Sequence, residues 1–469
     1  MTYLSALERA PVRALKPNRK NARKHSKQQV KQIAASIERF GFNNPILVDD
    51  AFGVLAGHGR LEAAKLLGMV EVPVIKLSHL SAPEKRAYMI ADNRLAEKAG
   101  WDKAILAVEF QDLIDLGFDV ELTGFDTGEI DLILDEVGEA DPDGPGPEDL
   151  VPPTSPTTVS QVGDMWVLGR HRLVCGDARE PASYAALMRG EQAHLVFTDP
   201  PYNVQISGNA SPSGAHGEFI MGSGELSPAA FEDFLVASLG ETAKNCRDGA
   251  IAFICMDWRH MDAVSAAGRR VFSSLKNLVV WSKTNAGMGS FYRSQHELVF
   301  VFKVGEGAHT NTFELGQHGR YRTNVWSYPG VNAFGATREQ DLALHPTVKP
   351  AAMVADAIKD VSKRGQIVLD PFGGSGSTLI AAETCGRSAR LIELDRAYCD
   401  VIVRRYERFS GKPGVLEASG ETFAQAAERR GAERPAGPSA ETAHESSAGP
   451  SAGSDTSAHA SLAGEAHDG

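Results

Sequence analysis

The chain has 469 residues, of which 42% are hydrophobic, and its formal net charge is −12. At roughly 150 residues per domain, this length predicts about three units with enough apolar residues for a sizeable core. The negative charge excludes a uniformly basic nucleic-acid coat. Apolar runs fall short of the ~18 residues of a membrane span, and the N-terminus lacks the apolar segment of a secretory signal. The scattered cysteines form no C-x-x-C pair, so we expect a cytoplasmic protein without a zinc ribbon, a disulfide framework or membrane contact.

Charge and composition divide the chain. Residues 1–101 carry a net charge of +8 and residues 102–150 a net charge of −15. This segregation indicates that the basic head meets phosphates and that the acidic stretch screens it, although ordinary solvated charge accounts for the acidic stretch equally well. We predict five parts: an N-terminal unit (1–100), an acidic helical extension (101–140), a Pro/Gly-rich linker (141–159), a large domain (160–410) and a disordered tail (411–469).

The N-terminal unit alternates helical and strand patterns. A basic amphipathic helix is predicted over residues 26–40, a strand over 45–48, a strand, turn and helix over 54–67, and a strand over 72–77. The unit resembles the small α+β domain of ParB proteins and sulfiredoxins. The resemblance rests on the turn Gly57-His58-Gly59-Arg60, which lies where ParB proteins carry a G-x-x-R turn that contacts a nucleotide.

The ParB-like turn supports two interpretations. The resemblance implies that Arg60 and neighbouring backbone amides bind a nucleotide phosphate or DNA. Alternatively, the domain is a degenerate one that serves docking or DNA affinity. Sulfinic-acid reduction is excluded, because sulfiredoxins need a cysteine in this turn and the first cysteine here is Cys175. Residues 82–138 are predicted to continue as helices. The acidic helices among them have apolar faces, which must pack on a neighbour within the chain or in a partner subunit.

The most informative segment of the large domain is the run Ala193–Asn203, AHLVFTDPPYN. A buried strand ends in Asp199-Pro200-Pro201-Tyr202, and the two prolines make a rigid turn that presents carbonyl acceptors. A carboxylate, a fixed carbonyl and an aromatic ring at the end of such a strand suit an exocyclic amino group on a flat ring. Asp199 and the Pro200 carbonyl accept its two N–H bonds, and Tyr202 stacks on the ring.

Further along, residues 281–302 and 319–330 mix basic and aromatic side chains, as a surface for phosphates and splayed bases would. The residues concerned are Arg293, His296, Arg320, Tyr321, Arg322 and Trp326. For each of them, an ordinary position in a loop or in the core is an equally good interpretation.

A glycine-rich turn joins a strand at 367–369 to a helix at 377–384. Its glycines allow close approach of a ligand, and the helix N-terminus favours a negative group. The turn lacks the G-K-[ST] of a P-loop and the third glycine of a dinucleotide fingerprint. A second strand ends in Glu393, which can bind both hydroxyls of a ribose or be a surface acid.

Together these motifs resemble the amino-group DNA methyltransferases, which transfer a methyl group from S-adenosylmethionine to adenine N6 or cytosine N4. The catalytic motif Asp199–Tyr202 precedes the cofactor loop Phe372–Gly376, which is the permuted order of the β class. His345–Pro350 resembles that class's HPTxKP motif, and Gly176-Asp177 resembles its adenine-contacting element. The expected fold is therefore α/β, with a Rossmann-like methyltransferase domain behind a small α+β ParB-like domain.

The resemblance also implies roles for single residues. The methionine end of the cofactor is expected at Asp370, Phe372, Gly373, Gly374, Ser375 and Gly376. Glu393 is expected on its ribose and Asp177 on its adenine, with Thr347 and Lys349 on its amino-acid end. No metal is required, the target base leaves the DNA duplex, and the β class suggests a homodimer.

We predict an adenine-N6 methyltransferase acting on double-stranded DNA, because cytosine-N4 members more often carry Ser where Asp199 stands. Cytosine-N4 methylation is the nearest alternative, and a non-catalytic, ParB-like DNA-binding adaptor is a more distant one. The sequence leaves open the recognition site and whether a restriction enzyme accompanies the protein.

Overall fold

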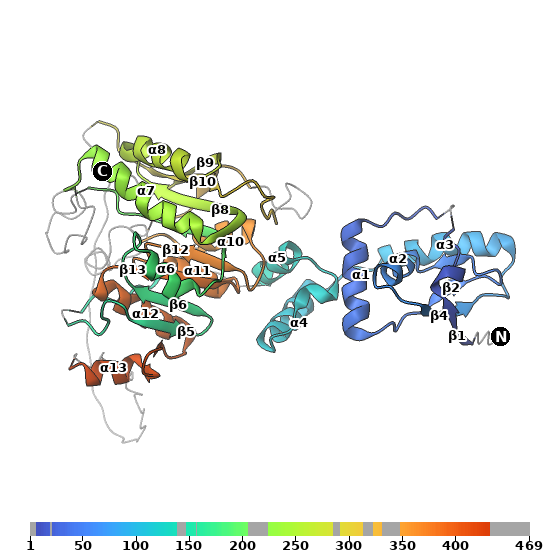
Figure 1. Cartoon of the computed structure of the whole chain (residues 1–469). Helices are drawn as coiled ribbons and strands as arrows, with labels where there is room; N and C mark the ends of the chain where they lie inside the picture. Colours follow the sequence, from blue (N-terminus) through green and yellow to red (C-terminus); the bar gives the residue numbers. More distant parts are fainter. Residues whose placement is uncertain are drawn as a thin grey trace, which may run out of the picture.

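The computed structural model describes residues 6–18, 21–137, 147–155, 157–204, 224–284, 291–312, 322–330 and 348–431. Figure 1 shows the chain within these ranges as an N-terminal unit and a large domain, with helices α4 and α5 between them. The N-terminal unit contains a four-stranded sheet and the large domain an eleven-stranded sheet.

The N-terminal sheet has the strand order β1-β4-β2-β3. Its core is made by fully buried aliphatic side chains such as Ile46, Val48 and Leu61. The first helix begins where Ser26 accepts a hydrogen bond from the Gln29 backbone N–H, as an N-cap serine does. The elements are β1 (Leu7–Pro11), α1 (Lys27–Phe40), β2 (Ile46–Val48), β3 (Val54–Ala56), α2 (His58–Leu66), β4 (Glu71–Lys76) and α3 (Ala82–Glu97).

The acidic extension folds into α4 (Lys103–Asp115), a 3-10 turn (Val120–Thr123) and α5 (Thr127–Val137). Their apolar faces pack mainly on one another and bury Phe110 and Ile130. The chain therefore supplies a neighbour for part of these faces, whereas Ile105, Val108 and Leu116 stay exposed.

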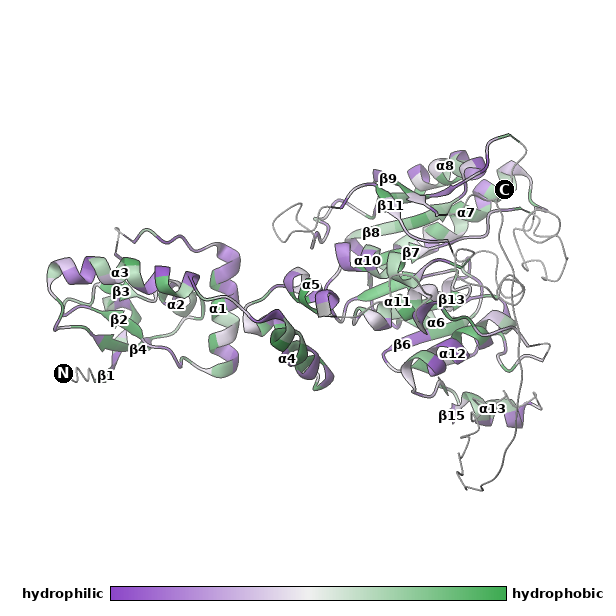
Figure 2. Cartoon of the chain, turned by 180° about the vertical axis from the view of Figure 1, so that it is seen from behind, coloured by the Kyte–Doolittle hydropathy of each residue, from purple (hydrophilic) through white to green (hydrophobic). Residues whose placement is uncertain are grey.

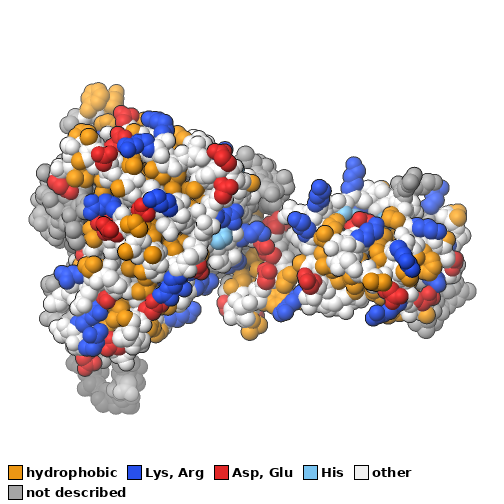
Figure 3. Space-filling model, in the orientation of Figure 1, with side chains coloured by type: hydrophobic (Ala, Val, Ile, Leu, Met, Phe, Trp, Pro, Cys, Tyr) orange, Lys and Arg blue, Asp and Glu red, His pale blue; other side chains and the backbone are white. Residues whose placement is uncertain are grey.

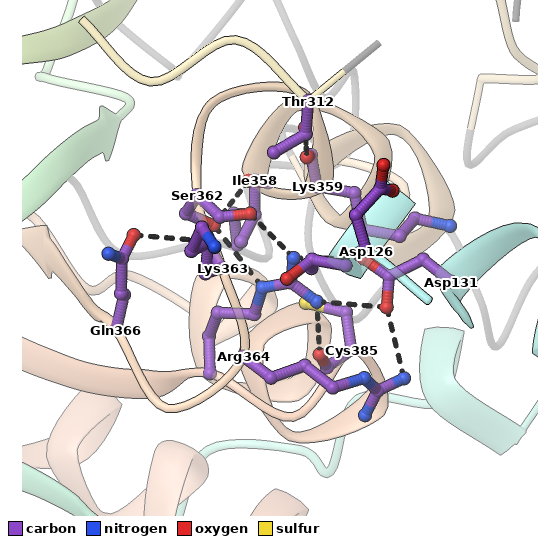
Figure 4. A network of polar contacts seen from close by, with 12 residues as sticks. Asp126, Asp131, Thr312, Ile358, Lys359, Ser362, Lys363, Arg364, Gln366 and Cys385 are labelled. Carbon is purple, nitrogen blue, oxygen red and sulfur yellow. Dashed lines mark hydrogen bonds and ion pairs between the residues drawn. The ribbon is translucent and has the colours of Figure 1, made fainter. Parts of the chain in front are cut away.

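Helix α5 is tied to the large domain by a buried ion-pair network (Figure 4). Asp131 lies 2.9 Å from the guanidinium of Arg387 and 3.1 Å from that of Arg364. Asp131 and Arg387 are almost completely buried. At the rim, Lys359 contacts Asp135 at 2.7 Å. Part of the acidic charge thus neutralises basic side chains of the large domain, an arrangement that Figure 3 shows as acidic residues gathered near the junction.

The large sheet has the order β11-β9-β10-β8-β7-β12-β13-β6-β5-β14-β15. The run from β8 to β6 is parallel, and β10 is antiparallel to β8. The strands are β5 (Met165–Leu168), β6 (His171–Cys175), β7 (Ala193–Thr198), β8 (Cys246–Met256), β9 (Ser274–Ser282), β10 (His296–Lys303), β11 (Val325–Ser327), β12 (Ile367–Asp370), β13 (Ser388–Glu393), β14 (Val415–Leu416) and β15 (Glu421–Thr422).

Helices cover both faces of this sheet, so its central strands are apolar on both sides, as Figure 2 shows. Along β7, Leu195 and Phe197 face the cluster with α10, α11 and α12, and Val196 faces the cluster with α6, α7 and α8. The helices are α6 (Pro181–Met188), α7 (Pro228–Lys244), α8 (Met261–Val271), α10 (Ala351–Val361), α11 (Ser377–Thr384), α12 (Arg396–Ser410) and α13 (Phe423–Arg429).

The predicted tail begins too early. Residues 411–431 are described, and within them β14 pairs with β5 and helix α13 packs on the core through Phe423 and Ala426. Apolar residues at helical spacing behind a Thr422/Gln425 capping box make this segment part of the domain. The rest of the predicted tail, from residue 432, lies outside the described residues.

The described part of the predicted linker, from residue 147 on, and the residue that follows it are packed against the large domain. The Val159 and Ser160 backbone N–H groups donate to the Asp400 carboxylate at 2.7 and 2.8 Å, and Arg405 donates to the Glu148 carbonyl at 2.7 Å. These bonds fix the chain on α12 as it enters the large domain. Among the helices of the described ranges, none has the length and apolar character to cross a membrane.

Replacing Asp131 by Asn should destabilise the large domain by about 3–5 kcal/mol, because two arginines would be left without their buried counter-charge. The shift of the urea unfolding midpoint measures this loss. The matched control is Glu136→Gln, which removes an exposed partner of Lys103 and should cost less than about 1 kcal/mol. Equal shifts for the two variants would contradict the buried network.

Candidate functional site

The predicted site residues converge on one edge of the large sheet. Strands β6, β7, β12 and β13 run parallel, so their carboxyl ends lie together. Asp199 follows β7, Asp370 and Glu393 end β12 and β13, and Asp177 follows β6. Ligands bind in this position in open α/β sheets.

Asp199 makes two short contacts. One carboxylate oxygen accepts a hydrogen bond from the Tyr202 hydroxyl at 2.6 Å, and the other lies 2.5 Å from the Lys349 ammonium. Asn203 holds the turn in place, because its side chain bonds the backbone of Leu226 in both directions. The rigid turn predicted from the two prolines is therefore also fixed from outside.

Glu297, at the start of β10, completes the cluster. One of its oxygens lies 3.1 Å from the Lys349 ammonium and 3.3 Å from the Tyr202 hydroxyl. Its other oxygen is bound by Lys283. Two carboxylates and two ammonium groups thus form a charge-balanced quartet (Asp199, Glu297, Lys283 and Lys349).

Burial and pairing shift the pKa values of this quartet in different directions. Burial raises the pKa of Asp199 and outweighs the opposing effect of Lys349. Burial also acts to raise the pKa of Glu297, but Lys349 and Lys283 together lower that pKa to about 2. For Lys349, the attraction of both carboxylates exceeds the cost of burial, so its pKa is raised and it stays charged.

The ammonium of Lys349 lies between the carboxylates of Asp199 and Glu297. The buried surroundings of Lys349 strengthen this attraction, because charges interact more strongly away from water. Its contact with the amino-acid end of a cofactor, which the resemblance to the HPTxKP motif implies, stays a prediction. Thr347 and His345 of the same motif lie outside the described residues.

The glycine-rich loop lies beside this cluster. Asp370 accepts hydrogen bonds from the Thr198 hydroxyl at 2.8 Å and from the Phe372 backbone N–H at 3.1 Å. Gly374 has a φ of +51°, and a Cβ placed on it would meet only the Phe372 carbonyl, at 3.9 Å, so the space around it is open. Gly373 and Gly376 instead pack against Ile402, and Ser375 accepts hydrogen bonds from Arg405.

Glu393 lies half-buried under this loop. Its carboxylate accepts hydrogen bonds from the Gly374 and Asp395 backbone N–H groups at 2.7 and 2.8 Å. Burial raises the pKa values of Glu393 and Asp370 to about 7. Asp177 is paired with the Arg179 guanidinium at 2.6 Å, and despite burial this contact lowers its pKa.

The basic and aromatic residues predicted to meet DNA divide into two groups. Arg322 binds Asp356 and Asp360 of α10, and Trp326 is buried in the core, so both are structural. Arg293 is exposed and His296 half-buried at the β9–β10 end that carries Glu297. Arg320 and Tyr321 lie outside the described residues.

The ParB-like turn forms the start of α2. Gly57 has a φ of +95°, and Arg60 folds over it and donates to the Pro45 carbonyl at 3.4 Å. Among the described residues, the buried Nε of Arg60 finds no hydrogen-bond partner. His58 accepts a hydrogen bond from the Asn18 backbone N–H, and burial lowers its pKa. A Cβ on Gly59 would lie 2.9 Å from the Cδ1 atom of Ile33 in α1, so a larger residue would require that side chain to shift.

Three protein-family models match successive parts of the chain. The DNA methylase family model matches residues 193–404, the ParB N-terminal domain model residues 4–94, and the ParB-methyltransferase HTH domain model residues 104–162. The ParB-like nuclease domain-containing protein YnaK of Escherichia coli (strain K12) is 47% identical over 76 residues, covering 16% of this chain and 87% of YnaK.

Two further matches cover the large domain. The DNA adenine methyltransferase YhdJ of Escherichia coli (strain K12) is 26% identical over 247 residues, covering 46% of this chain and 77% of YhdJ. The crystal structure of the M1.HpyAVI–SAM complex is 18% identical, covers 50% of this chain and 98% of its own, and has a TM-score of 0.37.

The large domain, over residues 193–404, belongs to the N6/N4 DNA methylase family, whose members use S-adenosylmethionine, and the chain carries a ParB-type N-terminal domain. It is a DNA methyltransferase in which the two domains are joined by a ParB-methyltransferase HTH segment.

Proposed function

We propose that the protein methylates the N6 amino group of adenine in double-stranded DNA. The observation that carries this proposal is the Asp199-Pro200-Pro201-Tyr202 turn, fixed at the end of β7 beside the glycine-rich loop. A base that enters this edge of the sheet would meet a carboxylate and a carbonyl on one side and the cofactor on the other.

The chemistry requires help from the turn. The lone pair of a nucleobase amino group is delocalised into the ring, so the nitrogen is a weak nucleophile. Asp199 and the Pro200 carbonyl accept hydrogen bonds from the two N–H groups of this nitrogen. These hydrogen bonds favour a pyramidal nitrogen with a free lone pair. The nitrogen would bond to the methyl carbon as the bond from that carbon to the sulfonium sulfur breaks, which leaves a neutral thioether. The positive charge would pass to the nitrogen, where the Asp199 carboxylate stabilises it, until the nitrogen releases one proton to solvent.

Cofactor binding falls to the neighbouring strand ends. S-adenosylmethionine supplies an electrophilic methyl group on a sulfonium. The open space at Gly374 fits its close approach, with Asp370, Phe372, Gly373, Ser375 and Gly376 around its methionine end. Glu393 would accept hydrogen bonds from the ribose hydroxyls, and Asp177 would contact the adenine. No metal is assigned a role.

The target base is proposed to be adenine because Asp199 occupies the first position of the motif, where cytosine-N4 enzymes more often carry Ser. The relative YhdJ is named a DNA adenine methyltransferase, which agrees with this choice. The base must leave the duplex to reach the turn, at a cost of a few kcal/mol. Tyr202 would then lie against its ring.

The ParB-type domain is proposed to bind a nucleotide phosphate or DNA through residues 57–60. The buried, unpartnered Nε of Arg60 among the described residues supports an anionic ligand there. A homodimer remains a prediction from the β-class resemblance.

Replacing Asp199 by Ala should lower methyl transfer by at least about 100-fold, because the amino group loses its charged acceptor. Labelled S-adenosylmethionine and unmethylated bacterial DNA, followed by nucleoside mass spectrometry, provide the measurement. N6-methyladenine from the unaltered protein is the expected product. N4-methylcytosine would contradict the adenine assignment, and absence of any methylated base would favour the DNA-binding adaptor.

Binding of S-adenosylmethionine should strengthen as the pH rises from about 6 to 8. The pKa values of Asp370 and Glu393 are raised to about 7 in the free protein, and a ligand that donates hydrogen bonds favours their ionised forms. Each released proton allows at most about a tenfold change in affinity per pH unit. Calorimetry of the unaltered protein and the Glu393→Gln variant measures this. If the variant showed the same change of affinity with pH as the unaltered protein, Glu393 would be excluded as a source of the pH dependence.

Replacing Arg60 by Ala should weaken binding of labelled duplex DNA or nucleotides by about tenfold or more, since hydrogen bonds between charged groups contribute ~1.5–3 kcal/mol. Methyl transfer to short DNA should stay intact. Fluorescence anisotropy measures the binding, with Lys65→Ala on the exposed face of the same helix as the control. Unchanged binding in the Arg60 variant would favour a docking role.

A further inference from the structure

Both oxygens of Asp199 are engaged by positively polarised donors. The Tyr202 hydroxyl lies 2.6 Å from one and the Lys349 ammonium 2.5 Å from the other. A carboxylate neutralised by an ammonium at this distance is a weaker acceptor for a third donor. The proposed reaction, however, needs Asp199 to accept an N–H bond from the substrate and to face the positive charge that develops on its nitrogen.

Glu297 lies within reach of the same two donors. The oxygen of Glu297 that faces the turn is 3.1 Å from the Lys349 ammonium and 3.3 Å from the Tyr202 hydroxyl. The two donors that bind Asp199 are therefore already in contact with a second acceptor, Glu297. Either donor can therefore pass from Asp199 to Glu297 by breaking its contact with Asp199 and shortening the contact that it already makes with Glu297.

Lys283 prepares Glu297 for this role. It binds the other Glu297 oxygen and leaves the one nearest the turn for Lys349 and Tyr202. The paired lysines keep Glu297 ionised, with a pKa of about 2. The Lys283 backbone is itself held by Gln295, whose side chain donates to its carbonyl at 2.8 Å. The hairpin of β9 and β10 thus presents a charged acceptor of fixed orientation to the catalytic turn.

We propose that Glu297 is a positioning residue that receives Lys349 from Asp199 when the amino group of the target base binds, so that the Asp199 carboxylate becomes free to accept from the substrate. This inference rests on the proposed function of the turn. Glu297 would thereby allow the catalytic turn to accept the substrate. The quartet stays charge-balanced throughout, because Lys349 moves between two carboxylates.

The test is a double-mutant cycle on the full chain with Glu297→Gln, Lys349→Met and the double variant. Single-turnover methylation of unmethylated bacterial DNA with labelled S-adenosylmethionine gives the transfer rate, and calorimetry gives the cofactor affinity. Glu297→Gln should lower the transfer rate about 10- to 100-fold with cofactor affinity within twofold. The matched control is Glu306→Gln, an exposed acid just beyond the far end of β10, which should transfer normally.

The double variant distinguishes positioning from a structural role. If Glu297 acts by receiving Lys349, its removal has no further effect once Lys349 is absent, so the double variant is no slower than Lys349→Met alone. Multiplicative losses, an unchanged rate in Glu297→Gln, or a loss of cofactor affinity equal to the loss of rate would overturn the inference. Failure of the unaltered protein to methylate DNA would instead overturn the proposed function.

Discussion

The parallel pairing of β6, β7, β12 and β13 is the constraint on which the site depends. It brings together segments that are far apart in the sequence, such as Arg172 of β6 and Arg390 of β13, and it places a carboxylate at or just after the end of each strand. Concentrating acidic groups in this way is costly unless each has a partner. Lys349, Arg179 and backbone N–H groups of the loop provide those partners, so the chemistry and the stability of this edge rest on the same contacts.

A second set of contacts joins the acidic extension to the opposite edge of this sheet, where the parallel strands begin. Helix α5 belongs to the segment that matches the ParB-methyltransferase HTH model, and its Asp131 binds Arg387. Arg387 follows α11, the helix that begins at the glycine-rich loop. Arg387 also directly precedes β13, so the ion pair holds the amino ends of these strands, at the edge opposite the site. The acidity of the extension, which composition alone explains equally well by solvation, has a specific structural use in this ion pair.

Sequence reasoning located the groups that follow directly from a strand or turn. Asp199, the glycine-rich loop and Glu393 each lie next to an apolar run whose end positions them, and helix α1 has both its cap and its apolar face in the sequence. Glu297 was missed because its role depends on pairing between β10 and β8, which no local pattern specifies. The available signal was that Glu297 lies at the start of the apolar run HELVFVFK and that Lys283 precedes this run in the sequence. Helix α13 was missed because its composition resembles the following tail, although its capping box was visible.

The account's central claim is that the turn after β7 holds the amino group of an extruded base. The most direct measurement is a crystal structure with a non-reactive analogue of S-adenosylmethionine and a duplex containing the mapped target site. We expect the adenine outside the helix stack, with its amino nitrogen about 2.7–3.2 Å from Asp199 and from the Pro200 carbonyl. A base that stays stacked in the duplex, or an amino group bound away from Asp199, would contradict the account.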